Sequence, residues 1–188
     1  PKEIEIVLDR KMERDVPVRA ALQLDVTEAH LLVGSVLTEP LFVRVIGPQA
    51  QVEKLDYIAT DSVKLQEISE EVDLVSPLRH PERTRLVLSP GSVRIRADIQ
   101  ILAEDDLSGV PIKMRNGGNV QLRPDPAIAR VKVRGGVDVI AQLDPIKDIE
   151  LYVDYAEFQG DSLPIRNAEA PFFDVLSITP SEVNLVGD

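Results

Sequence analysis

The sequence predicts a mostly β protein built from two copies of one small domain. An alternating apolar and polar pattern that ends in glycine occurs at Leu41–Gly47 and again at Ala129–Gly135. Gly47 and Gly135 are 88 residues apart. Aromatic residues make up only 4% of the chain and tryptophan is absent, so the cores must consist mainly of Val, Leu and Ile. Branched side chains of this kind pack well on a pleated sheet.

The spacing extends beyond the two glycines. The same distance of 88 residues separates Val52 from Ile140, Leu55 from Leu143 and Ile58 from Ile146. A chain of 188 residues has room for two domains of about 90 residues each. We therefore predict one domain at 1–97 and a second at 98–188.

Composition narrows the classes of partner and chemistry. The formal net charge is -11 and the pI is near 4.7, so nucleic acid and anionic membrane surfaces are poor partners. The lack of cysteine excludes thiol catalysis, disulfides and Cys-ligated metals. No apolar run reaches the ~18 residues of a membrane span. The chain opens inside the strand-like pattern Ile4–Leu8, which suggests a piece of a longer protein with an anchor upstream.

Strand-like alternation fills most of the first copy. We expect Arg10–Asp15 to be a charged connection and Gly34 to form a bulge. Pro48 is expected at the first position of a two-turn helix that carries Val52 and Leu55 on one face. The expected strands are Ile4–Leu8, Val16–Leu24, Leu31–Leu37, Leu41–Gly47, Asp61–Leu65, Glu70–Val75 and Arg85–Leu88.

The second copy begins where the first one ends. Val93–Leu102 contains no breaker and predicts one long strand, or two joined by a slight bend, that both copies share, with Ile101 on its apolar side. Pro90 and Pro180 are 90 residues apart, so two residues are gained between the helix and the last strand. The other expected elements are turns at Asn116–Asn119 and Gly160–Asp161, a helix at Val137–Asp144 ended by Pro145, and strands at Leu151–Asp154, Leu163–Ile165 and Pro171–Leu176.

The order of these features, seen twice, resembles a tandem pair of YbbR-like domains. The features are a strand with a proline, a strand ending in glycine before a short helix, a third strand and a closing Pro-x-x-Val. Besides the two glycine strands, they are Val16-Pro17-Val18 and Val110-Pro111-Ile112, Leu151–Asp154, and Pro90–Val93 and Pro180–Val183. The first copy departs from the pattern, because Gln66 stands where the second has Asp154 and the acidic Glu70–Asp73 replaces a small turn.

The resemblance implies a fold and a role that the residues alone do not give. Each repeat would be a small twisted β-sheet or half-barrel with one short helix. Family members are bacterial and carry an N-terminal transmembrane helix followed by repeats outside the membrane. Their best understood role is the regulation of a membrane-bound diadenylate cyclase, which makes cyclic di-AMP. The family has no catalytic residues to carry over.

Candidate catalytic and metal-binding residues are few. His30 lies beside an apolar run and His80 in an expected turn with Pro81 and Glu82, and neither has metal-ligand spacing around it. Glu104–Asp106 could suggest a calcium loop, which needs acidic residues at alternate positions, a glycine and a distal glutamate, but Asp105–Gly109 does not fit that pattern. We predict a solvated connection there. A looser acidic set, Asp154, Glu157 and Asp161, is best interpreted as a solvated strand end. We predict no catalytic, cofactor-binding or metal-binding residue.

Two further features bear on binding. Gly135-Gly136 before a helix is typical of a phosphate loop, but the full glycine motif is missing, so structural turns are the better interpretation. Pro17, Pro111 and Pro164 indicate edge strands, whose free backbone groups can pair with a partner strand. Edge strands and the acidic surface are therefore where a protein partner is expected.

The combined prediction is a non-enzymatic, extracytoplasmic protein-interaction module, held at the membrane by an upstream anchor and acting on a diadenylate cyclase. The alternative is a cell-envelope module that binds polymer or another envelope protein and has no link to a cyclase. A third class, a hydrolase or metal enzyme, would need a metal site or a cluster of acids with a histidine.

Overall fold

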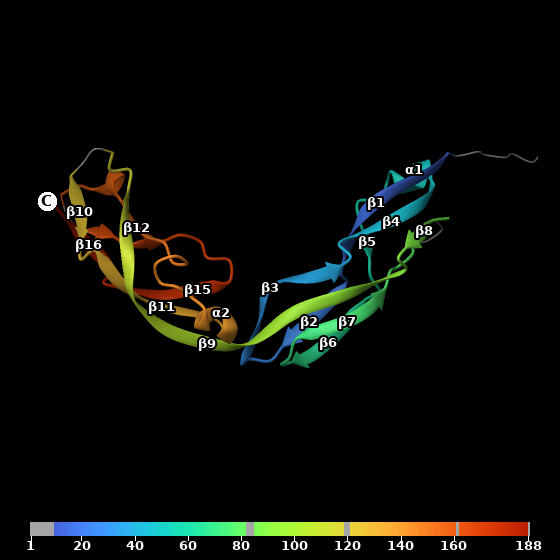
Figure 1. Cartoon of the computed structure of the whole chain (residues 1–188), viewed down its shortest axis with the longest axis horizontal. Coiled ribbons are helices and arrows are strands. Elements are labelled where there is room, and N and C mark those ends of the chain that lie inside the picture. The colour runs from blue at the N-terminus through green and yellow to red at the C-terminus, as the bar shows by residue number, and fades with distance from the viewer. Residues whose placement is uncertain (1–9, 82–84, 119–120, 161, 188) are drawn as a thin grey trace, which may run out of the picture. The chain divides into compact units, whose positions relative to one another are not determined.

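The computed structural model describes residues 10–81, 85–118, 121–160 and 162–187 (Figure 1). The strand expected at Ile4–Leu8 lies outside these ranges. The chain divides into two compact units: unit 1 comprises Pro1–Thr27 and Ser35–Ile99, and unit 2 comprises Glu28–Gly34 and Gln100–Asp188.

The mostly β class predicted from the sequence is confirmed, with one short α-helix among the described residues of each unit. Strands in unit 1 and across its boundary are β1 (Lys11–Arg19), β2 (Leu22–Val26), β3 (His30–Glu39), β4 (Phe42–Pro48), β5 (Ile58–Ala59), β6 (Val63–Ile68), β7 (Val72–Pro77), β8 (Val87–Ser89) and β9 (Ser92–Arg115). Those of unit 2 are β10 (Leu122–Asp125), β11 (Ile128–Gly136), β12 (Leu151–Asp154), β13 (Leu163–Pro164), β14 (Arg166–Asn167), β15 (Phe173–Thr179) and β16 (Glu182–Gly187). The α-helices are α1 (Gln49–Val52) and α2 (Val137–Ala141), and a 3-10 turn covers Tyr155–Glu157.

The same strand order occurs in both units. Unit 1 has the order β5-β1-β4-β8, and unit 2 has β12-β9-β11-β15 with β14 added beside β12. In each, the central pair is antiparallel, β1 with β4 and β9 with β11, and a parallel strand joins on one side, β5 or β12. The repeat that the sequence predicts is therefore present as a repeated sheet topology.

A second, smaller set of pairings also repeats. Strands β3 and β7 both pair with β9, and in unit 2 strands β10 and β13 both pair with β16. Strand β9 is continuous over 24 residues, so the single long strand shared by both copies is confirmed. Ile101, expected on its apolar side, is 56% exposed, because the row of buried residues stops at Ile99.

Each unit has a core of its own. On β4, Val43 and Val45 are buried while Arg44 between them is exposed, and Val131 and Val133 repeat this pattern on β11. Burial of such a side chain stabilises a fold by about 1.5–3 kcal/mol. The core of unit 1 consists of Val16, Val43, Val45, Val52, Ile58, Leu78, Leu86, Leu88, Val93 and Ile95. That of unit 2 consists of Val110, Ile112, Ala129, Val131, Val133, Ile140, Ile149, Leu151, Val153, Leu163, Ile165 and Val183.

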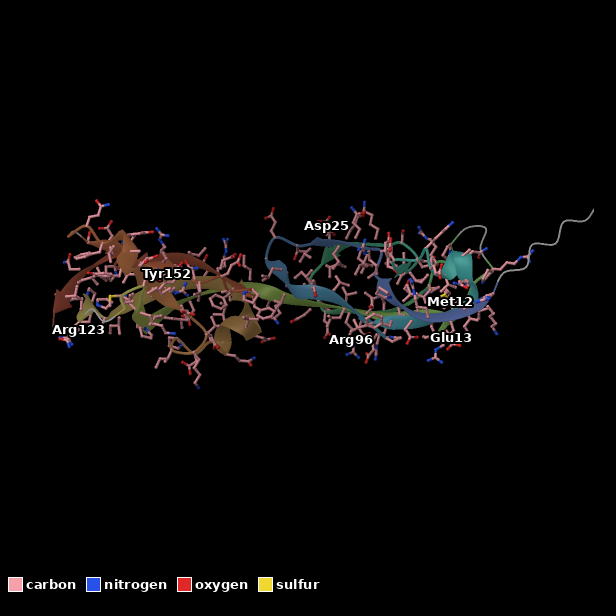
Figure 2. All side chains as sticks on the ribbon, turned by 90° about the horizontal axis from the view of Figure 1, so that it is seen from above. Met12, Glu13, Asp25, Arg96, Arg123 and Tyr152 are labelled. Carbon is pink, nitrogen blue, oxygen red and sulfur yellow. The ribbon has the colours of Figure 1, made fainter. Side chains whose placement is uncertain are left out.

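The charged segment Arg10–Asp15 is a strand rather than the connection we predicted. Residues 11–17 form a ladder with β4. Met12 packs against the core of unit 1, while its neighbour Glu13 lies in solvent with its carboxylate 3.0 Å from Arg44 (Figure 2). The charges of β1 therefore form one solvated face, except Arg14, which lies on the side of Met12 and donates to the carbonyl oxygen of Leu55. Sequence reasoning mistook this strand for a loop.

Both helices are shorter than predicted. Helix α1 has four residues and leaves out Leu55, and α2 ends at Ala141, before Asp144. Pro48 is the N-cap residue of α1 and not its first helical residue. One turn of helix has little stability of its own and depends on packing, here through the buried Val52 of α1.

The sheet register corrects the predicted match between the copies. Val18 of β1 pairs with Ile58, and Ile112 of β9 pairs with Leu151. Leu151 is thus the counterpart of Ile58, and the spacing at this point is 93 residues. Ile146, the counterpart predicted from the sequence, is 68% exposed in the segment after α2.

An inserted turn explains this difference. In unit 2 the chain makes a turn at residues 144–148, where the amide of Asp148 donates to the carbonyl oxygen of Asp144 at 2.9 Å. The spacing therefore grows by five residues before β12 and shrinks by three afterwards, instead of growing once by two. By the same register Asp61, and not Gln66, is the counterpart of Asp154.

Pro17 and Pro111 lie at the ends of parallel β-ladders, and their strands are not edge strands. Strands β1 and β9 have neighbours on both sides, but the parallel ladder begins at Val18, directly after Pro17, and at Ile112, directly after Pro111. Because proline lacks an N–H, it removes one ladder position without making the whole strand an edge. The edge prediction is wrong for these two strands and confirmed for Pro164, since β13 is the outer strand of its sheet.

The two glycines of the repeat permit a close approach. A Cβ on Gly47 would lie 2.6 Å from Cδ2 of Leu86 and 3.1 Å from the carbonyl oxygen of Arg85. A Cβ on Gly135 would lie 3.1 Å from Cβ of Phe173. In unit 1 the approaching residues lie just before the outer strand β8, and in unit 2 the approaching residue begins the outer strand β15. This shared close approach explains why glycine recurs at this position.

We therefore expect Gly47→Ala to lower the free energy of unfolding by about 1–3 kcal/mol, because the added methyl group overlaps backbone as well as a core side chain. Gly91→Ala is the matched control, since a Cβ there meets nothing within 4 Å. Urea unfolding followed by circular dichroism measures both variants. Equal stability of the two variants would contradict the close approach.

Candidate interaction surface

The predicted histidine candidates do not assemble into a site. His30 begins β3 and is half-buried, and His80 is exposed. Glu82 of the expected turn lies outside the described residues. Within 10–81, 85–118, 121–160 and 162–187, no group of three or more His, Asp or Glu side chains could hold a metal ion.

The acidic triple Glu104–Asp106 lies within β9 and is not the connection we predicted. Glu104 and Asp106 stand opposite Arg134 and Lys132 of β11, so their carboxylates share the solvent face of the sheet with cations. The Oε2 atom of Glu104 is 2.7 Å from Nζ of Lys132. The hydrogen bond from Lys132, together with its charge, holds the pKa of the Glu104 carboxyl below its ordinary value.

In the second acidic set, Asp154 and Glu157 also accept hydrogen bonds from donors within the protein. Asp154 accepts hydrogen bonds from the side-chain amide of Asn116 at 2.8 Å and from the backbone N–H of Ala156 at 3.0 Å. Those bonds lower the pKa of Asp154, with the one from Asn116 contributing most. Both carboxylate oxygens of Glu157 accept from Arg166 at 2.8 Å. Asp161 lies outside the described residues.

The glycines before α2 serve packing rather than phosphate binding. A Cβ on Gly136 would lie 2.7 Å from Cγ2 of Val33 and would also overlap the side-chain amide of Gln100. The amide of Asp138, which an anion would use, already donates to Oε1 of Gln100 at 3.1 Å. In unit 1 the amide of Gln49 donates to the carbonyl oxygen of Arg10 at 2.8 Å. The interpretation as structural turns therefore fits the geometry.

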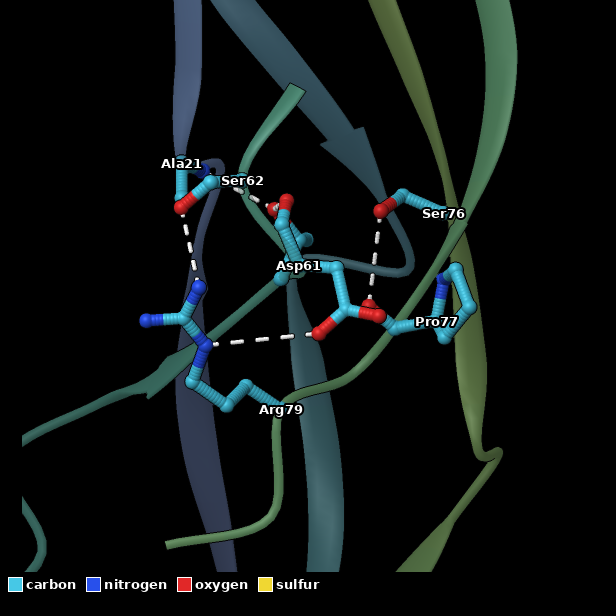
Figure 3. A network of polar contacts seen from close by, with 7 residues as sticks. Ala21, Asp61, Ser62, Ser76, Pro77 and Arg79 are labelled. Carbon is cyan, nitrogen blue, oxygen red and sulfur yellow. Dashed lines mark hydrogen bonds and ion pairs between the residues drawn. The ribbon is translucent and has the colours of Figure 1, made fainter.

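Polar contacts lie at the end of the parallel ladder in unit 1 (Figure 3). The hydroxyl of Thr60, which is fully buried, accepts from the amide of Ala21 at 2.9 Å and donates to the carbonyl oxygen of Asp61 at 3.1 Å. The guanidinium of Arg79, which is exposed, donates to the hydroxyl of Ser62 at 2.9 Å and lies 4.0 Å from the carboxylate of Asp61. Thr60 is thus satisfied by backbone groups, and these contacts are structural.

The corresponding face of unit 2 carries an aromatic ring among charges. The guanidinium of Arg115 lies 3.7 Å from the ring centre of Tyr152, which Figure 2 labels, and 3.0 Å from the carboxylate of Glu150. Lys113 is 3.9 Å from the same carboxylate. The hydrogen bond from Arg115 and the charge of Lys113 lower the pKa of Glu150. Exposed pairs of this kind contribute little to stability and chiefly fix side-chain positions.

A groove in unit 1 is the feature that sequence reasoning missed. It has a volume of about 470 Å³. Its lining residues are Lys11, Ile46, Gly47, Pro48, Arg85 and Val87. Lys11 was missed because its segment was interpreted as a connection, and Arg85 because it carries no motif. The signal that could have found the groove is the repeated glycine, whose close approach brings Arg85 to the end of β4.

Comparison with known proteins adds sequence similarity to this geometry. No protein-family model matches the chain. Over 138 residues it is 25% identical to the CdaA regulatory protein CdaR of Bacillus subtilis (strain 168). The chain is similar to a CdaR-type regulator. The match covers 71% of this chain and spans 28% of the length of the regulator. The predicted resemblance to a YbbR-like protein of the CdaR type is confirmed, and the chain is related to a regulatory module.

Two solved structures share a distant likeness with the chain. The solution structure of SuR18C from Streptococcus thermophilus is 22% identical with a TM-score of 0.38, and the match covers 52% of this chain and 91% of that one. The crystal structure of a YbbR-like protein from Streptococcus pneumoniae TIGR4 is 14% identical with a TM-score of 0.38, and the match covers 98% of this chain and 100% of that one. Among the residues that the structure describes, no helix is long and apolar enough to cross a membrane.

The pair Glu104–Lys132 gives a pH prediction for this surface. Because the folded-state pKa of Glu104 is lowered, its contribution to stability is present above the unfolded-state pKa and is lost as pH falls through the folded-state value. We expect Lys132→Gln to move the pKa of Glu104 up toward its ordinary value. Carbon-detected NMR titration of the carboxyl measures it, with Lys147→Gln as the control. An unchanged midpoint in Lys132→Gln would show that the pair does not form in solution.

Proposed function

We propose that the chain is a non-enzymatic protein-interaction module from a membrane-anchored regulator of a diadenylate cyclase. It acts on the extracytoplasmic side of the bacterial membrane. The proposed module consists of two YbbR-like domains, at 1–97 and 98–188. The observation that carries the proposal is the similarity to the CdaA regulatory protein CdaR over most of this chain.

The surface chemistry supports binding over catalysis. Three of the acidic side chains that sequence reasoning singled out, Glu104, Asp154 and Glu157, contact basic side chains or hydrogen-bond donors of the protein. A general acid or base needs a titratable group free to exchange a proton with a substrate. Regulation would instead depend on contact, by a difference in affinity of this module for two states of the cyclase.

The test is the cyclic di-AMP content of cells that co-express the full-length protein and the diadenylate cyclase of its own genome. We expect the content to change when the full-length protein is present and the change to disappear when residues 1–188 are deleted. Immunoblots of the membrane fraction establish that both proteins are present. Equal content with and without these residues would exclude the cyclase as the target and favour the cell-envelope alternative.

A further inference from the structure

We propose that the groove of unit 1 is the docking site for an extended, acidic segment of the protein partner. This inference rests on the proposed function and specifies its contact surface. The segment would place an apolar side chain over Ile46 and Val87 and carboxylates beside Lys11 and Arg85.

The groove has the size and lining of a peptide-binding site. Its volume of about 470 Å³ lies within the range of ligand pockets in proteins. Its wall is apolar, with Ile46 of β4 opposite Val87 of β8, and Val87 is 61% exposed. Pro48 closes the end toward α1.

The equivalent place in unit 2 shows what kind of segment fits. The register makes Arg134 and Asp174 the counterparts of Ile46 and Val87, since each pair faces across the same two strands. The hollow beside them is lined by Leu31–Gly34, the start of β3. A Cβ on Gly34 would lie only 3.6 Å from Cε1 of Phe172. In unit 2 an apolar stretch of chain therefore forms one wall of this place and leaves a hollow of about 180 Å³.

In unit 1 the lining comes only from β1, β4, β8 and the residues next to them. No segment within the described ranges takes the position that Leu31–Gly34 has in unit 2. The repeat thus provides one narrowed and one open example of the same groove.

The charges at the open groove define the partner. The counterparts of Lys11 and Arg85 in unit 2 are Leu102 and Phe172. Both are apolar, like the neighbouring Leu31–Gly34. Among the described residues, neither Lys11 nor Arg85 has an ion-pair partner, although the chain has 32 acidic and 21 basic residues. Two cations with no ion-pair partner among the described residues, beside an apolar wall, are complementary to carboxylates on an otherwise apolar segment.

The backbone offers a way to hold such a segment. Strand β8 is the outer strand of the order β5-β1-β4-β8, and pairs only with β4 among the described strands. The backbone groups on its other side are available to an added strand, which gives affinity through main-chain hydrogen bonds. Side chains of the added strand would then alternate between the groove and solvent.

Photo-cross-linking identifies the occupant. Val87 is replaced by benzoylphenylalanine in the full-length protein, which is co-expressed with the diadenylate cyclase of its genome and irradiated in cells. The same replacement at Val75, which is 68% exposed on β7, is the control position. We expect a cross-link to the cyclase from Val87 and none from Val75, and mass spectrometry of the product should map an acidic, extended segment.

Charge reversal tests the role of the two cations. We expect Lys11→Glu combined with Arg85→Glu to reduce cross-linking from position 87 by about tenfold or more. Lys54→Glu combined with Lys64→Glu changes the net charge of the same unit equally at exposed sites outside the groove and should leave it unchanged. Thermal melting of the purified 188-residue variants checks that both pairs of substitutions leave the fold intact.

Each other outcome overturns the inference. A cross-link to a second copy, or within the same chain, would assign the groove to self-association or to an internal segment. No cross-link from Val87, in cells whose cyclic di-AMP content still depends on residues 1–188, would place the contact elsewhere and leave the proposed function standing. A content that is independent of these residues would overturn both.

Discussion

Both units depend on a close approach at a glycine. At the end of each central strand, Gly47 or Gly135 faces the start of the outer strand or the residues just before it. A Cβ on Gly47 would overlap Leu86, and a Cβ on Gly135 would lie only 3.1 Å from Cβ of Phe173. This approach seats Leu86 and Phe173 against their cores and fixes the strand order on that side of the sheet. This contact positions the outer strand of each sheet. The short helix follows the central strand, and the parallel ladder lies on the other side of the same sheet.

The same contact creates a hollow beside the glycine, and the two copies treat it differently. In unit 2 the start of β3 forms one of its walls, whereas in unit 1 its lining includes Lys11 and Arg85. A repeat can in this way keep one fold while one copy uses a surface for its own packing and the other presents it to a partner. Regulation by contact then needs no catalytic residue, only a difference in affinity for two partner states.

The sequence was informative where a pattern had one physical meaning. Alternation predicted the strands around Val43 and Val131, and the recurring glycine predicted the repeat. It was misleading where one pattern has two meanings. The charges before Val16 suit a loop as well as a solvated strand face, and only pairing decides. Ile146 matched Ile58 in spacing and type, yet an inserted turn exposes it. The groove was missed, because its lining comes from β1, β4, β8 and the residues before β8, and the recurring glycine was its one signal in the sequence.

The measurement that tests the central claim most directly is a titration of the purified chain against the diadenylate cyclase that we propose as its partner, in lipid nanodiscs. Calorimetry gives the bound fraction, and the rate of cyclic di-AMP synthesis is read in the same samples. A regulatory interaction module should bind saturably and change the rate in proportion to the bound fraction. An active cyclase that does not bind the chain, or whose rate is the same when fully bound, would contradict the account.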